Sequence, residues 1–192
     1  MLLLWIPLCF LCGALPMSVW VGKLALGVDI RQFGDGNPGA TNVFRAGGKG
    51  WGMLALLLDF LKGALPVALA NFGWQMEGWA LAAVATAPIA GHAFSPFLGW
   101  RGGKALAVTF GVWTGLSLFV VPILLGLLFA VWLYALRPEG WAVLLGCLCL
   151  LAGLLLLDAP LAWLGTWLGM TAVLVISHRA DLSEWPVIRK RY

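Results

Sequence analysis

The sequence predicts an all-α integral membrane protein. Its residues are 62% hydrophobic and only 10% charged, and the mean hydropathy of +0.96 lies outside the range of soluble globular domains. The hydrophobic residues form long continuous runs, without the alternation of a membrane β-barrel strand. A run of about 20 such residues lets a helix cross a hydrocarbon core of about 30 Å. In a membrane protein the net charge of +4 reports topology, so no nucleic-acid partner is expected.

Long apolar runs divide the chain into its predicted membrane spans. They cover residues 2–22, 52–72, 79–99, 105–136 and 141–176. The first begins like a signal peptide, but it has no basic residues before it and continues to Leu26, so we expect a retained span. The last two runs are too long for one helix each. We expect the fourth to turn near Ser117 to Pro122 and the fifth at Asp158 to Pro160, each forming two short spans.

Basic residues lie in alternate connections between these spans. Lys and Arg near span ends favour the cytoplasmic side. The basic clusters are residues 23–49, Arg101 with Lys104, Arg137, and Arg179 with residues 189–191. The outer loops that follow from this placement contain Glu77 and Asp158 but no Lys or Arg. The distribution predicts seven transmembrane helices, with the N-terminus outside and the C-terminus cytoplasmic, in one transmembrane domain over residues 1–192.

The longest polar segment runs from Gly27 to Gly50 and reads GVDIRQFGDGNPGATNVFRAGGKG. Its glycines allow positive φ and can turn backbone N–H groups toward one point, as in anion-binding nests and helix N-termini. Arg45 and Lys49 add positive charge. The segment is equally consistent with a phosphate site and with a flexible loop between two membrane helices.

Ionisable and sulfur-containing side chains inside the apolar runs have mainly structural interpretations. Asp59 and Lys62 are three residues apart in the second predicted span, so they share one helix face. Charges at membrane depth are costly and tend to pair inside the bundle. We therefore favour an internal ion pair over a catalytic role. The four cysteines all lie in apolar runs and are expected to be buried free thiols, not disulfides or metal ligands.

Two further polar segments follow later spans. One is GHAFSPFLGWRGGKALA, from Gly91 to Ala107, in which His92 is consistent with a buried core histidine. Its Gly-Gly-Lys places backbone N–H groups and an ammonium just before a helix, which favours a phosphate site over a simple topology signal. The other, Ser177 to Asp181, closes the last span, where cations often serve only as topology signals and helix-dipole partners. All three polar segments are predicted on one membrane face, where they can converge on one site.

These motifs carry a resemblance to a known family. GNPGATNVFR from Gly36, GHAFSPFL from Gly91 followed by GGK, and SHR from Ser177 resemble, in order and spacing, the bacterial acyl-phosphate:glycerol-3-phosphate acyltransferase family of the PlsY type. Asp-x-x-Lys-Gly from Asp59 to Gly63 is similar as well, so the resemblance covers nearly the whole chain. It implies a seven-span bacterial inner-membrane enzyme with its motif loops on the cytoplasmic side. Such an enzyme transfers a fatty acyl group from acyl phosphate to the 1-hydroxyl of glycerol-3-phosphate, giving lysophosphatidic acid and phosphate in the first step of phospholipid synthesis.

The resemblance also implies residue roles. Arg45, Lys104 and His178 would be catalytic and would hold the phosphate of glycerol-3-phosphate. The residues implied in binding substrate are Asn37, Gly39, Thr41, Asn42, His92, Ser95, Gly102, Gly103 and Ser177, of which Gly39, Thr41 and Asn42 would cradle the acyl phosphate. The partners are these two substrates and membrane lipid, with no cofactor or metal and no protein partner indicated. A His-x4-Asp pair is absent, and proximity and electrostatics would act on a donor that is already activated.

The sequence departs from the family's usual pattern at several positions. Asp35 replaces the usual Ser, Asp181 replaces the usual Asn, and Ala105 replaces a Gly. Each aspartate adds negative charge where a phosphate should approach, which leaves room for an altered acceptor or a helper cation. Arg31, Arg179 and the basic tail are candidates to neutralise these aspartates.

Alternatives from other classes remain. A transporter or a phosphate-binding membrane protein without acyltransferase activity would share the polar loops, although a transporter would need more polar residues than Asp59, Lys62 and His92 within its spans. A CDP-alcohol phosphotransferase would need several aspartates on neighbouring helix turns to hold metal ions. Only Asp59 lies within a predicted span before the late loops, which disfavours that class.

Overall fold

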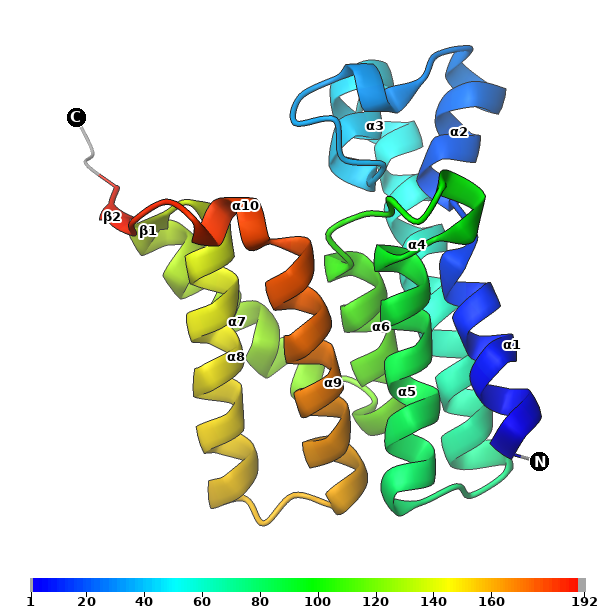
Figure 1. Cartoon of the computed structure of the whole chain (residues 1–192), viewed down its shortest axis with the longest axis vertical. Helices are drawn as coiled ribbons and strands as arrows, with labels where there is room; N and C mark the ends of the chain where they lie inside the picture. Colours follow the sequence, from blue (N-terminus) through cyan, green and yellow to red (C-terminus); the bar gives the residue numbers. More distant parts are fainter. Residues whose placement is uncertain (1, 190–192) are drawn as a thin grey trace.

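The computed structural model describes residues 2–189, and most of these residues are helical (Figure 1). The helices in chain order are α1 (Leu2–Ala14), α2 (Met17–Leu26), α3 (Ala40–Gly47), α4 (Lys49–Ala68), α5 (Gly78–Ala93), α6 (Leu106–Ser117), α7 (Val120–Ala135), α8 (Glu139–Leu156), α9 (Leu161–Ser177) and α10 (Arg179–Leu182). The short elements are the 3-10 turns η1 (Ile30–Gln32) and η3 (Pro96–Leu98), the π-turn η2 (Leu69–Gly73), and the antiparallel strands β1 (Leu136–Arg137) and β2 (Val187–Ile188).

The helices have the length and surface of a membrane bundle. Within the described residues, four helical segments are long and apolar enough to cross a membrane: Leu4–Leu26, Lys49–Gly73, Gly78–Leu98 and Glu139–Leu156. Helices α6, α7 and α9 are apolar but shorter. Large hydrophobic side chains such as Leu65, Leu127 and Leu168 point outward and are exposed, as lipid-facing residues are. The fold class is therefore the predicted one, an all-α integral membrane protein.

Both long apolar runs are divided where turns were predicted. Helix α6 ends at Ser117 and α7 begins at Val120, and the Ser117 hydroxyl accepts a hydrogen bond from the backbone N–H of Val121 at 3.2 Å. Helix α8 ends at Leu156 and α9 begins after Pro160, whose ring is suited to the start of a helix. The polar and proline residues between the runs thus act as helix ends, as expected.

The first apolar run, in contrast, is interrupted at Leu15 and Pro16, a break that the sequence pattern had not indicated. Pro16 has no N–H to continue the helix. Two buried side chains from other segments satisfy carbonyls at the break. Lys62 Nζ donates to the Leu15 carbonyl at 2.7 Å, and Ser95 Oγ donates to the Ala14 carbonyl at 2.6 Å. The break is therefore stabilised by contacts between segments distant in the sequence.

The predicted ion pair between Asp59 and Lys62 is confirmed. Lys62 Nζ lies 2.8 Å from Asp59 Oδ1, with side-chain exposures of 3% and 2%. Ser18 on α2 donates its hydroxyl to Asp59 Oδ2 at 2.5 Å. Through Ser18 and the Leu15 carbonyl, the pair on α4 holds both sides of the break between α1 and α2.

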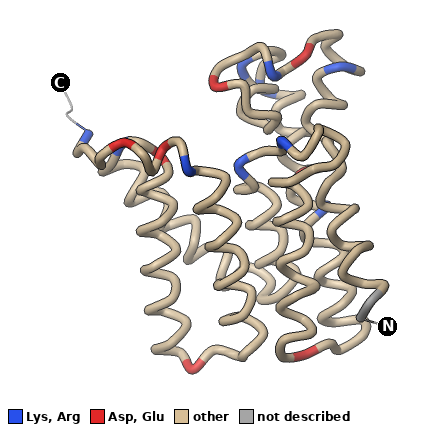
Figure 2. Tube along the Cα trace, in the orientation of Figure 1, with Lys and Arg blue, Asp and Glu red and all other residues tan. Residues whose placement is uncertain are grey.

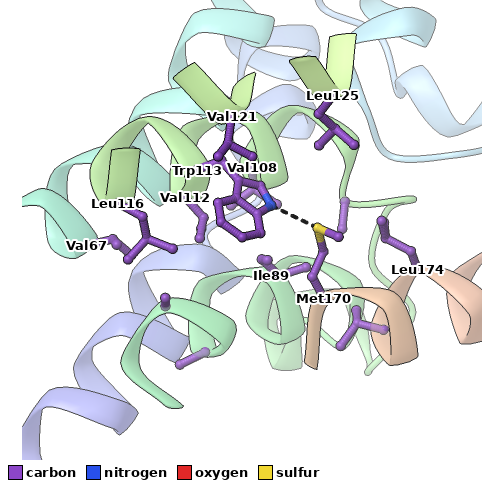
Figure 3. Close-up of a cluster of buried hydrophobic side chains, with 14 of the residues drawn as sticks. Val67, Ile89, Val108, Val112, Trp113, Leu116, Val121, Leu125, Met170 and Leu174 are labelled. Carbon is purple, nitrogen blue, oxygen red and sulfur yellow. Dashed lines mark hydrogen bonds between the residues drawn. The ribbon is translucent and has the colours of Figure 1, made fainter. Parts of the chain in front are cut away.

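The main hydrophobic core lies among α5, α6 and α9, with Trp113 fully buried in it (Figure 3). Trp113 Nε1 donates to the sulfur of Met170 at 3.0 Å, which joins α6 to α9. Glycine lets other helices approach closely, as is common in membrane bundles. A Cβ added at Gly111 on α6 would collide with the Phe60 carbonyl on α4. All four cysteines are free; Cys9 and Cys147 are buried as predicted, whereas Cys12 and Cys149 are only half-buried.

Charged residues gather at one end of the bundle, which we call the polar end (Figure 2). This end carries the segment from η1 to α3, the connection from η3 to α6, and α10 (Figure 1). At the opposite end, the connections before α5 and before α9 contain only Glu77 and Asp158 as charged residues. The fold thus brings the three predicted polar segments to the same end of the molecule.

Candidate functional site

Two adjoining cavities open at the polar end. The first, of about 510 Å³, is lined by Gly34, Asp35, Asn37, Gly39–Thr41, Arg45, Leu56, Asp59, His92, Lys104–Ala107 and Glu139. The second, also about 510 Å³, is lined by Arg31, Asp35–Pro38, Ala93, Phe94, Leu98, Trp100–Lys104, Ser177, Arg179 and Ala180. Asp35, Asn37 and Lys104 belong to both, so they form the wall between the two cavities.

The wall of the first cavity depends on the fold of the segment before α3. Gly34 has a positive φ of 58°, and a Cβ there would collide with the guanidinium of Arg45. Asn42 is buried and binds three groups of this segment. Its amide donates to the Asn37 carbonyl at 2.8 Å and to Asp35 Oδ1 at 3.1 Å, and its oxygen accepts from Arg45 Nη1 at 2.9 Å. Asn42 therefore positions the Arg45 guanidinium and does not itself line either cavity.

The N-terminus of α3 faces the first cavity. Gly39 precedes the helix in extended conformation, and Gly39, Ala40 and Thr41 all contribute to the cavity wall. The first N–H groups of a helix have no partner within it and carry the positive end of its dipole. Together with Arg45, this helix end provides a favourable environment for an anionic group.

The segment before α6 is fixed by its own backbone. The N–H of Gly102 donates to the Ala93 carbonyl at 3.0 Å, and that of Gly103 donates to the His92 carbonyl at 3.1 Å. A side chain at either glycine would collide with this part of α5. Both glycine N–H groups are therefore used within the fold and are not free for a phosphate, while the predicted phosphate site at this segment stays a prediction that depends on Lys104. The Lys104 N–H donates instead to the side-chain Oδ1 of Asn37 at 3.2 Å.

Lys104 lies among carboxylates. Its Nζ is 3.3 Å from Asp35 Oδ2, 3.5 Å from Asp181 Oδ2 and 3.9 Å from Glu139 Oε2. Burial alone would lower the pKa of Lys104, but the attraction of Asp181 and Asp35 outweighs it and raises the pKa. Burial would likewise raise the pKa of Asp35, but the N–H of Asn37 and the charge of Lys104 lower it.

Among the described residues, Arg31, Arg179 and Arg189 do not pair with Asp35 or Asp181, so these three candidates are not the partners of the two aspartates. Arg31 pairs with Asp29 at 2.7 Å, and Arg179 donates to the Ile176 carbonyl at 3.3 Å. In the basic tail, Arg189 donates to the Leu136 carbonyl, while residues 190 and 191 lie outside the described residues. Within residues 2–189, Lys104 therefore provides the positive charge nearest to both aspartates, with Arg45 at 3.9 Å from Asp35.

His178 is buried and lines neither cavity, although its neighbours Ser177 and Arg179 line the second one. Its Nδ1 lies 2.9 Å from the Leu174 carbonyl and must donate to it, which leaves Nε2 of the neutral ring as a hydrogen-bond acceptor. Burial lowers the pKa of His178, so the ring is uncharged at neutral pH. Nε2 is buried without a hydrogen-bond partner among the described residues, so it can accept a hydrogen bond from a hydroxyl group. Ser177 donates to the Val173 and Leu174 carbonyls and lines the second cavity.

The remaining candidates have structural contacts. His92 lines the first cavity but is largely buried, with Nδ1 3.8 Å from Asp59 Oδ1. Ser95, bonded to Ala14, lines neither cavity. The sequence interpretation had not included Glu139, which lines the first cavity, because an acidic residue at a helix start is an ordinary feature. It had also placed Asp59 only in an internal pair, although Asp59 borders the same cavity.

The fold and these cavities define a multi-pass integral membrane protein with polar, charged cavities at one end. The glycerol-3-phosphate acyltransferase family model matches residues 3–185, so the chain belongs to this family. Glycerol-3-phosphate acyltransferase 1 of Deinococcus radiodurans is 40% identical over 95% of this chain and 90% of its own. A Thermotoga maritima relative of the same name is 43% identical over 60% of this chain and 58% of its own.

Solved structures of one protein have the same fold. The crystal structure of PlsY (YgiH), an integral membrane glycerol 3-phosphate acyltransferase, in its glycerol 3-phosphate form, superposes with a TM-score of 0.83. It shares 31% sequence identity and covers 95% of this chain and 90% of that one. Its lysophosphatidic acid form gives the same TM-score. The resemblance seen in the motifs is thereby confirmed at the level of the family and the whole fold.

Proposed function

We propose that this glycerol-3-phosphate acyltransferase uses acyl phosphate as its donor and releases lysophosphatidic acid and inorganic phosphate. The 1-hydroxyl oxygen of glycerol-3-phosphate attacks the acyl carbonyl, the bond between carbonyl carbon and phosphate oxygen breaks, and the departing phosphate takes the hydroxyl proton. The observation that carries the proposal is the composition of the first cavity. Its lining combines Arg45, Lys104 and the α3 N-terminus, which supply positive charge, with Leu56 and Leu106, which supply apolar surface.

The residues have distinct roles in this reaction. Arg45 and Lys104 hold the acceptor phosphate, and Gly39 and Thr41 at the α3 N-terminus hold the acyl phosphate and stabilise charge on its carbonyl oxygen. His178 Nε2 accepts a hydrogen bond from the glycerol moiety, because the neutral ring cannot form an ion pair with phosphate. Supporting residues are Asn37, Asn42, His92, Ser95, Gly102, Gly103 and Ser177, which fix the walls of the site.

The proposal includes the orientation in the membrane. We place the polar end in the cytoplasm of a bacterial cell, with seven crossings of the inner membrane and the N-terminus outside. Helices α6, α7 and α9 then make short crossings, and residues 1–192 form one domain. The support is the charge distribution, because Lys and Arg near helix ends favour the cytoplasmic side and the opposite connections hold only Glu77 and Asp158.

The experiment is phosphate release by the purified protein given palmitoyl phosphate and glycerol-3-phosphate, with the lipid product resolved. Release that requires glycerol-3-phosphate and yields lysophosphatidic acid is expected. Turnover with acyl-coenzyme A but not with acyl phosphate would overturn the choice of donor. A folded protein that is silent with both would overturn the whole reaction, and uptake into proteoliposomes would then test transport.

Variants test the assignment of the cations. Arg45→Ala or Lys104→Ala removes a charge-assisted phosphate contact, which costs about 1.5–3 kcal/mol. We expect kcat/KM to fall by about 10-fold to 150-fold at one decade per 1.4 kcal/mol. Lys23→Ala is the matched control, because Lys23 is an exposed cation on α2 that lines neither cavity. Full activity in the Arg45 or Lys104 variant would contradict the assignment.

A further inference from the structure

The charge balance around Lys104 is unusual for a site that receives two phosphorylated substrates. Carboxylates from three separate elements lie within 4 Å of its ammonium: Asp35 before α3, Glu139 at the start of α8 and Asp181 on α10. Arg45 is the second cation of the group, 3.9 Å from Asp35, and His178 is uncharged at neutral pH. The immediate surroundings of Lys104 therefore hold more negative than positive charge.

The other charged residues lining cavities with Lys104 are Arg31, Asp59, Arg101, Arg137, Arg179, Glu184 and Arg189, of which Asp59 is paired with Lys62. Within the part of the chain that the structure describes, none of them forms an ion pair with Asp35 or Asp181. Arg31 is engaged by Asp29, and Arg179 and Arg189 donate to backbone carbonyls. These residues do not replace Lys104 as the nearest cation to the two aspartates.

Both aspartates are held in place by backbone donors. Asp35 Oδ1 accepts from the backbone N–H of Asn37 at 3.2 Å and from the side-chain amide of Asn42 at 3.1 Å. Its other oxygen, Oδ2, faces Lys104. Asp181 Oδ2 accepts from the N–H of Gly140 at 3.2 Å as well as facing Lys104. An ammonium has three donor protons, so carboxylate oxygens fixed here compete with phosphate oxygens for the same donors.

We propose that Asp35 and Asp181 set the specificity of the acceptor site, by weakening the binding of a phosphate dianion and favouring the monoanion of a phosphate monoester. This inference rests on the proposed function. The second pKa of a phosphate monoester is about 6. The monoanion keeps a P–OH that can donate to a fixed carboxylate oxygen, whereas the dianion has no proton and is repelled by both carboxylates. Acceptor affinity then falls as pH rises above about 6.

The test uses Asp35→Asn and Asp181→Asn, separately and together. The amide oxygen can still accept from the same backbone N–H groups, so the variants keep these backbone contacts and remove only the negative charge facing Lys104. We measure binding of glycerol-3-phosphate by calorimetry without donor, and its KM with donor, from pH 5.5 to 8. The native Kd is expected to rise by up to tenfold per pH unit above about 6, the limit when only the monoanion binds. At pH 8 each variant should bind about threefold tighter and the double variant about tenfold tighter, with a flatter pH dependence.

Asp158→Asn is the matched control. It makes the same chemical change at the opposite end, at a residue with a φ of 48° that Asn also tolerates. Its affinity and pH dependence should equal those of the native protein. An unchanged or weaker affinity in both aspartate variants, or an unchanged pH dependence in the double variant, would overturn the inference.

Failure of the proposed function gives a different result. A protein that binds glycerol-3-phosphate with the expected pH dependence but does not transfer acyl groups from acyl phosphate overturns the reaction and leaves this inference standing. Normal transfer with the same acceptor affinity in all variants overturns only the inference. No binding of glycerol-3-phosphate by the folded native protein overturns both.

Discussion

The buried pair of Asp59 and Lys62 permits a quantitative prediction about stability. We consider Asp59→Asn, Lys62→Met and the double variant. In the first, the ammonium of Lys62 keeps only the Leu15 carbonyl as its partner at 2.7 Å. In the second, the carboxylate of Asp59 keeps only the hydroxyl of Ser18 at 2.5 Å as a close partner. Each single variant therefore leaves one uncompensated charge in a position that is almost fully buried.

Removing one partner of a buried ion pair costs about 3–5 kcal/mol, whereas replacing both by uncharged residues of similar size is often nearly neutral. The double variant leaves no charge. The amide oxygen of the Asn can still accept from the Ser18 hydroxyl, and the Leu15 carbonyl still accepts from the Met17 N–H at 2.9 Å. We expect each single variant to lose about 3–5 kcal/mol, and the double variant to lose less than either single variant.

The assay is reversible unfolding in mixed micelles, followed by near-ultraviolet circular dichroism at neutral pH. The coupling free energy from the double-mutant cycle should be about 3 kcal/mol or more in favour of the pair. Losses that simply add in the double variant would refute the reasoning, because they would mean that the two side chains act independently. Specific activity of the folded double variant separately measures any role of Asp59 at the cavity.

Two further predictions concern the site. Gly103→Ala places a methyl group against the ring of His92. We expect the free energy of unfolding to fall by about 1–3 kcal/mol, and kcat/KM to fall because Lys104 is displaced. A melting temperature and a rate equal to the native values would contradict this packing. Burial lowers the pKa of His178 below 6.5, so below that pH the unfolded chain binds more protons than the folded one. The contribution of His178 to stability should therefore be fully present above pH 6.5 and fall as pH decreases. His178→Asn should show a shallower decrease in melting temperature between pH 7.5 and 5 than the native protein. An equal slope would exclude His178 as a source of the pH dependence.

Much of the fold follows from local chemistry that the sequence displays. The divisions at Ser117 and at Pro160 could be predicted for two reasons. Basic clusters on the same side of the membrane must be separated by an even number of spans, and polar and proline residues mark in the sequence where each long run can break. The break at Leu15 and Pro16 could not, because a proline in an apolar run is compatible with a kinked helix. What stabilises this break is a pair of donors, Lys62 and Ser95, that reach it from distant parts of the chain.

The site shows the same division between local and distant information. The motifs identified residues that the cavities bring together, among them Asn37, Arg45 and Lys104. They did not show which polar groups are used inside the fold. Gly102 and Gly103 were expected to present N–H groups, but these groups bind carbonyls of α5. Such partners depend on how two segments pack, which residue type and spacing alone do not specify.

A series of contacts connects the buried pair of Asp59 and Lys62 with the site around Lys104. Lys62 and Ser18 fix the direction of α2 after the break, and α2 leads into the segment that carries Asn37. Asn37 in turn accepts from the backbone of Lys104. A lysine side chain has many rotamers, and holding it in one place costs conformational entropy. Here its backbone is fixed by Asn37 and its ammonium by anchored carboxylates, so the cation is positioned before a phosphate arrives, and the same carboxylates set how strongly that phosphate is bound.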